Sequence, residues 1–68
     1  NERRFEMKKY YVPTFGEFYL NSLRHLVVKV ETLEGMEIDP EDMELNQEAY
    51  LYFKSGTGVT KTHVTRIL

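Results

Sequence analysis

The stretch HLVVKVETLEGMEID, residues 25–39, decides the fold because it reads as two strands joined by a tight turn. Leu26, Val28 and Val30 occupy alternate positions, which is the pattern of a strand with one buried face and many β-branched side chains. Gly35 follows, and glycine accepts positive φ in a two-residue turn without steric strain. We therefore predict an antiparallel hairpin here.

The residues after this hairpin predict a bend and a second hairpin. Asp39 and Pro40 end the returning strand, because proline has no N–H for a strand ladder and aspartate caps a short helical turn. Residues 50–53 form an apolar run, 55–58 a glycine-containing turn and 59–68 a threonine-rich strand. Leu51 and Phe53 of this run are predicted to point into the core.

The residues before the first hairpin predict a helix. Thr14 and Glu17 have the spacing of a capping box, in which both side chains satisfy free N–H groups of the first turn. A stripe of apolar residues at three- and four-residue steps then follows on a helix that ends near residue 25: Phe15, Phe18 or Tyr19, Leu23 and Leu26. We expect this stripe to cover the sheet.

Length and composition bound the class of protein. A chain of 68 residues is one domain with a thin core, and it contains no cysteine for a disulfide. Self-association is therefore a natural source of extra stability. We divide the chain into an N-terminal arm or edge strand, residues 1–13, and one small domain, residues 14–68. No apolar run is long enough for a signal peptide or a membrane span, so we expect a cytoplasmic protein without a membrane partner.

The charge pattern is more informative than the net charge of −2. Every charged residue between Glu31 and Glu48 is acidic, whereas lysine and arginine gather toward both ends of the chain. We therefore expect a dipolar molecule with an acidic middle segment.

Together these patterns predict an α+β fold in which an N-terminal helix packs on a small, strongly bent antiparallel sheet or barrel, of the SH3-like or Sm-like kind. Three segments carry a resemblance to a family. They are LNSLRHLVVKVETLEG at 20–35, LNQEAYLYF at 45–53 and VTKTHVTRIL at 59–68. In element order and apolar spacing they resemble the Sm-like small barrels, which include the Sm and LSm proteins and the RNA chaperone Hfq.

The resemblance implies RNA binding or membership of a ribonucleoprotein assembly, as an oligomer closed through strand edges. The family's bending glycine is Pro40 here, and its Arg-Gly pair is Thr60–Lys61. The Rho inhibitor Rof, a related small barrel that binds a protein, also lacks the bending glycine. A protein-interaction module therefore stays open as the alternative.

The candidate nucleic-acid-binding residues lie in the second hairpin. Tyr50 and Tyr52 share the strand face opposite to Leu51, where tyrosines stack on bases and lysines contact phosphates. The full set is Tyr50, Tyr52, Lys54, Lys61 and His63. The plainer interpretation is that these tyrosines lie at a sheet edge or an interface.

The candidate protein-binding residues lie in the acidic segment and are Asp39, Glu41, Asp42 and Glu44. A patch of one sign speeds the encounter with a basic partner, such as a nucleic-acid-binding protein that this chain would inhibit. The plainer interpretation is a solvated acidic loop.

Catalysis is not expected. His25 and His63 have no nucleophile in a recognisable arrangement with them, and the SGTG sequence at 55–58 lacks the lysine of a phosphate-binding loop. We predict a protein that is not an enzyme and has no cofactor, metal or small-molecule substrate.

Overall fold

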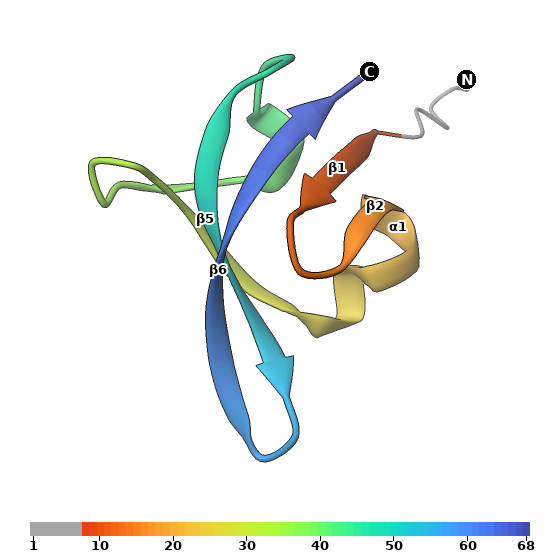
Figure 1. The fold of residues 1–68 in the computed structure, drawn as a ribbon. Helices are drawn as coiled ribbons and strands as arrows, with labels where there is room; N and C mark the ends of the chain where they lie inside the picture. Colours follow the sequence, from red (N-terminus) through yellow and green to blue (C-terminus); the bar gives the residue numbers. More distant parts are fainter. Residues whose placement is uncertain (1–7) are drawn as a thin grey trace, which may run out of the picture.

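The computed structural model describes residues 8–68, which form one antiparallel sheet with short helical turns (Figure 1). Residues 1–7 of the predicted arm lie outside the described residues. In chain order the elements are β1 (Lys9–Val12), β2 (Gly16–Tyr19), α1 (Leu20–Leu23), the 3₁₀ turn η1 (Arg24–Leu26), β3 (Val27–Thr32), β4 (Glu37–Ile38), the 3₁₀ turn η2 (Pro40–Asp42), β5 (Glu48–Ser55) and β6 (Gly58–Ile67).

The sheet has six strands in the order β2-β1-β6-β5-β3-β4, and each neighbouring pair is antiparallel. The twisted hairpin of β5 and β6 lies at its centre, with the β1–β2 hairpin beside β6 (Figure 1). Both long strands and their turn at 55–58 confirm the predicted second hairpin. Within the segment predicted as an arm or edge strand, residues 9–12 form β1, which lies between β2 and β6.

The predicted barrel was wrong, because the sheet of residues 8–68 is neither closed nor strongly curled. Its end strands, β2 and β4, do not pair with each other within the described chain. β4 has only two residues, because Pro40 cannot donate to a ladder and the chain turns into η2. The wall that would have closed a barrel therefore stops at Ile38.

The predicted N-terminal helix was also wrong: α1 is short and internal, and it follows the β1–β2 hairpin. Residues 13–15, between β1 and β2, form a turn in which the Phe15 N–H donates to the Val12 carbonyl oxygen at 2.9 Å. Pro13 favours this turn, and Gly16 leaves it with a φ of 105°. A three-residue turn closed by a glycine thus replaces the capping box, and the side chain of Phe15 is 64% exposed.

A β-bulge changes the face that β3 presents. Val27 pairs with Phe53 and Lys29 with Tyr52, so Val28 is an extra residue in this strand. Val28 was predicted to be buried, but it is 48% exposed. The bulge turns Val27 toward the core in its place.

The first hairpin and its end agree with the prediction, but its turn has three residues, 33–35, in place of the predicted two. The Thr32 N–H donates to the Met36 carbonyl oxygen at 2.8 Å, across a turn in which Gly35 has a φ of 95°. The Asp39 carboxylate accepts from the Glu41 N–H at 2.9 Å and so caps η2, as expected of an aspartate before a proline. The predicted helical turn is confirmed over Pro40–Asp42.

The core lies between one face of the sheet and the segments that contain α1 and η2. Its buried side chains are Tyr10, Val12, Leu20, Val30, Met43, Ala49, Leu51 and Val64. Leu51 and Phe53 point toward it, as predicted. The opposite face of the sheet, here called the outer face, is left to solvent and to polar side chains.

Candidate nucleic-acid interface

The strand register places most of the predicted nucleic-acid-binding residues together on the outer face. Tyr50 pairs directly with His63, and Tyr52 pairs with Lys61. Directly paired residues of antiparallel strands point to the same side of a sheet. Because Leu51 between the tyrosines is buried, all of these side chains lie on the side away from the core.

Lys61 lies over two tyrosine rings at once. Its Nζ is 4.4 Å from the ring centroid of Tyr50 and 5.8 Å from that of Tyr52. Both distances are within the range of a cation–π interaction. Tyr50, Tyr52 and Lys61 thus share one surface, and nucleic-acid binding there stays a prediction.

Lys29 of β3, which was not among the predicted residues, also contacts the ring of Tyr52. Lys29 Nζ lies 4.8 Å from the Tyr52 ring centroid and 2.9 Å from the Glu31 carboxylate. The Tyr52 hydroxyl donates to the same carboxylate at 3.1 Å. These hydrogen bonds, from Lys29 and then Tyr52, lower the pKa of Glu31, and the hydrogen bond to Glu31 raises the pKa of Lys29.

The sequence contained part of the signal for this contact. Alternation along residues 26–31 already put Lys29 and Glu31 on the face opposite to the core. Only the strand order, in which β3 lies directly beside β5, shows that this face continues into that of Tyr52.

His63 completes the cluster at its other end. Its ring meets the Tyr50 ring edge-on, at 6.2 Å between centroids and 82° between planes. His63 Nε2 lies 3.1 Å from the Glu48 carboxylate oxygen. Lys54 lies apart: it pairs with Val59 near the tip of the hairpin, is exposed, and contacts no other member of the cluster within residues 8–68.

The predicted acidic protein-binding set is divided by the structure. Asp39 caps η2, and Glu41 forms an ion pair with Arg24. The backbone carbonyl of Glu41 also accepts from Lys8 Nζ at 2.6 Å. The Asp39 carboxylate thus caps η2 itself, whereas the carboxylate and carbonyl of Glu41 join η2 to Arg24 and Lys8.

Asp42 and Glu44 form the remaining acidic pair. Both are exposed, and neither side chain forms an ion pair within residues 8–68. The Glu44 backbone N–H donates to the side-chain oxygen of Gln47 at 2.8 Å. The acidic surface that is left is smaller than the predicted one.

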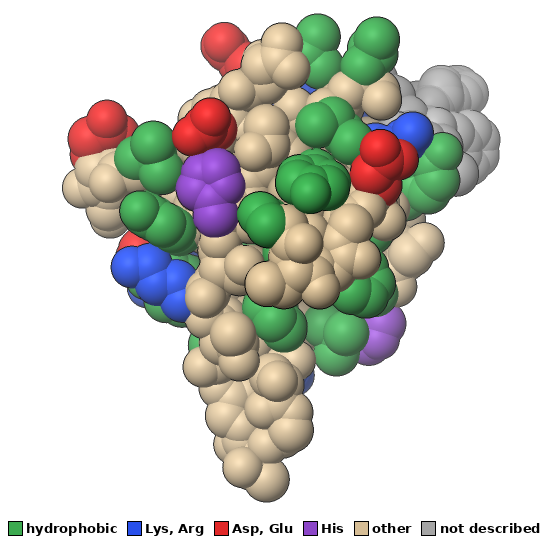
Figure 2. All heavy atoms as spheres, in the orientation of Figure 1, with side chains coloured by type: hydrophobic (Ala, Val, Ile, Leu, Met, Phe, Trp, Pro, Cys, Tyr) green, Lys and Arg blue, Asp and Glu red, His purple; other side chains and the backbone are tan. Residues whose placement is uncertain are grey.

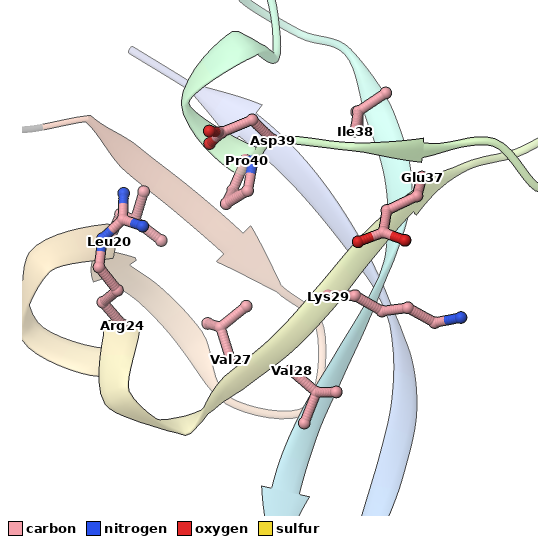
Figure 3. A pocket seen from close by; sticks show the side chains of 9 residues that line it. All are labelled: Leu20, Arg24, Val27, Val28, Lys29, Glu37, Ile38, Asp39 and Pro40. Atoms are coloured by element: carbon pink, nitrogen blue, oxygen red, sulfur yellow. The ribbon is translucent and has the colours of Figure 1, made fainter.

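A groove of about 630 Å³ opens where the sheet fails to close (Figure 3). It lies between η1 and the start of β3 on one side and β4 with η2 on the other, with Val27 and Pro40 facing it. Both cations that line it are paired, Arg24 with Glu41 and Lys29 with Glu31. Its carboxylates are Asp39, which caps η2, and Glu37, which is exposed. The outer face is therefore the stronger candidate.

Within residues 8–68, histidine, aspartate and glutamate do not gather in a cluster that could hold a metal ion. No helix there has the length and apolarity to cross a membrane. Protein-family models, curated proteins and solved structures were each compared with the chain, and no match was found in any of them.

Proposed function

We propose that this chain binds single-stranded RNA on the outer face of β5 and β6, as a module without catalytic activity. The position of Lys61 over the rings of Tyr50 and Tyr52 carries the proposal. Aromatic rings on an open sheet offer stacking platforms for bases, and a nearby ammonium group offers a phosphate contact. Membership of the Sm-like family and closure into an oligomer stay predictions.

Lys61 also suggests how binding proceeds. In the free protein its ammonium group lies against ring faces that a base would need. When a base stacks there, the lysine moves outward on its flexible stem and meets the phosphate. Stacking contributes about 1–3 kcal/mol per base, which exceeds the cation–π contact of about 0.5–1 kcal/mol that is lost.

The charges of the face limit how much phosphates contribute. Glu31 pairs with Lys29 and partly neutralises it, and Glu48 beside His63 adds a negative charge to the face. Lys61 forms no ion pair within residues 8–68 and is the main cation left for phosphate. We therefore expect binding that depends on stacking, with a shallow salt dependence of about −0.7 in log–log slope for each phosphate neutralised.

Fluorescence anisotropy with a labelled oligouridine at low salt tests the proposal. Tyr50→Leu and Tyr52→Leu keep apolar volume but remove the stacking platform, and each is expected to weaken binding about fivefold or more. Phe15→Leu is the matched control, because Phe15 is exposed but packs edge-on against Phe18 on the core side of the sheet.

Three results would contradict the proposal: no binding at low salt, equal binding of an RNA duplex, or equal losses in the Phe15→Leu control. If RNA does not bind, the alternative function to test is protein binding through the acidic segment. There, Asp42→Asn with Glu44→Gln should weaken the capture of a basic partner protein, because these carboxylates of that segment form no ion pair and no helix cap within residues 8–68.

A further inference from the structure

We infer that the β1–β2 half of the outer face extends the proposed site, so that one strand of RNA crosses the sheet diagonally from Tyr52 to Tyr19. This inference rests on the proposed function and names further binding residues: Lys9, Tyr11 and Tyr19. None of these was a candidate from the sequence.

The register places these residues on the same side of the sheet as the first cluster. Lys9 pairs with Tyr19, and Tyr11 pairs with both Glu17 and Thr65. Tyr10, between Lys9 and Tyr11, is buried in the core. Since side chains alternate along a strand, Lys9 and Tyr11 point outward, and Tyr19 joins them across the ladder.

The second cluster repeats the chemistry of the first. Tyr11 is 41% exposed and Tyr19 is 42% exposed, so both are more open to a ligand than Tyr50 and Tyr52. Lys9 Nζ lies 5.7 Å from the Tyr19 ring centroid and 3.6 Å from the Glu17 carboxylate. A tyrosine with a lysine over its ring thus occurs in both halves of the face.

The two clusters are continuous across β6. Thr65, the outward partner of Tyr11, stands two positions along the strand from His63, the partner of Tyr50. Thr65 is small, and its neighbour on β5, the exposed Glu48 carboxylate, borders the path between the rings. Strands lie about 4.8 Å apart, so the three steps from β2 to β5 span about 14 Å, which more than one nucleotide is needed to cross.

Figure 2 agrees with this arrangement. Green side chains, the class that includes tyrosine, lie over β1 and beside the β5–β6 hairpin, with blue, red and purple ones among them. The mixture of rings and cations favours an anionic strand with exposed bases over a purely apolar partner. A duplex is disfavoured, because its bases already stack on one another.

Oligouridines of about three and about twelve nucleotides separate the two halves of the face. The wild-type chain is expected to bind the long strand at least about tenfold more tightly than the short one. Tyr19→Leu and Tyr11→Leu should each weaken binding of the long strand about fivefold and leave the short strand unchanged if it stays on Tyr50 and Tyr52. Phe15→Leu is again the control, since it lies in the β1–β2 turn but faces the core side.

The outcomes distinguish the extension from the proposed function. Length-dependent binding that Tyr19→Leu abolishes, with folding verified by circular dichroism, supports the extension. Equal affinity for both lengths and no effect of Tyr11→Leu or Tyr19→Leu would overturn the extension and leave the Tyr50–Tyr52 site standing. Absence of binding to either strand by the wild-type chain would overturn both.

Discussion

At the scale of single residues, Tyr10 joins the sheet to η2. Its ring is buried against Phe18 and its hydroxyl donates to the Pro40 carbonyl oxygen at 2.5 Å. Burial raises the pKa of Tyr10 above its ordinary value of 10.0, because the charged phenolate loses its hydration in the core. The folded state therefore holds this proton more tightly than the unfolded state does.

Tyr10 should make the fold sensitive to alkali. Its stabilising contribution is fully present below pH 10.0, the ordinary pKa, and is lost as the pH rises from there through the raised pKa of the folded state. Tyr10→Phe should lower the free energy of unfolding at neutral pH by about 1 kcal/mol and show less further loss at high pH. Urea unfolding at about pH 8 and about pH 11 measures both. An identical alkaline loss in the two chains would contradict this assignment.

Two glycines form a matched pair for a test of backbone strain. Gly16 has a φ of 105°, which residues with a Cβ rarely adopt, whereas Gly58 does not have a positive φ. A Cβ at either position would meet no heavy atom within 4 Å. Gly16→Ala is therefore expected to lower the free energy of unfolding by about 1–2 kcal/mol through the backbone alone.

The control for that substitution is Gly58→Ala, which should change the free energy of unfolding by less than about 0.5 kcal/mol. Urea denaturation of both variants is the measurement. Equal losses would show that the Gly16 turn is not the source of the effect.

At the scale of elements, the sequence predicted strands that alternate and missed those whose partners are distant. β3, β5, β6 and the Gly35 turn were predictable, because period-two patterns and glycine chemistry act within a few residues. The segment 14–19 was mistaken for a helix, since the spacing of a capping box also occurs in a hairpin turn. Pro13 and Gly16, three residues apart, contained the better signal.

The bulge at Val28 could not be read from the sequence. Apolar residues at 26, 27, 28 and 30 fit either face, so the alternation does not fix where the strand register shifts. Pairing with β5 decides it, because Phe53 needs Val27 beside it on the core face.

The contact between β3 and β5 predicts an acid sensitivity. The pKa of Glu31 is lowered by hydrogen bonds from Lys29 and Tyr52, so its stabilising contribution is present above its ordinary value of 4.5 and is lost as the pH falls through the lowered value. Glu31→Gln should unfold at a lower temperature at pH 7 and show a smaller further decrease on acidification. Thermal midpoints between about pH 3 and about pH 6 test this. A pH dependence unchanged by the substitution would contradict it.

At the scale of the whole molecule, the strand order explains which sequence predictions agree with the structure and which do not. The Tyr50, Tyr52, Lys61 and His63 group formed as expected, because all four lie on one hairpin and local alternation fixes their face. Strand closure and the contribution of β1 depend on contacts between distant segments, which a single sequence does not specify. In the acidic set, Asp39 and Glu41 have partners within the fold, and the sequence did not indicate that of Glu41.

The distribution of charge predicts the effect of removing one carboxylate from the outer face. Glu48 lies beside His63 and Tyr50, and its side chain is 54% exposed. Glu48→Gln should strengthen oligouridine binding about twofold to threefold at low salt, with the gain shrinking as salt screens the face.

Glu34→Gln is the matched control for that prediction, because Glu34 is exposed in the β3–β4 turn and the change in net charge is the same. Anisotropy titrations of both variants at two salt concentrations provide the measurement. An equal gain in the control would assign the effect to overall charge and not to the outer face.

The two open ends of the sheet have a consequence for behaviour at high concentration. Such ends are templates on which further copies can add strand by strand and grow into fibrils. Here one end strand has four residues and the other has two, followed by a proline that lacks the N–H needed to continue a ladder. Fibril growth by strand addition is therefore disfavoured at both ends. This favours solubility even though the sheet stays open.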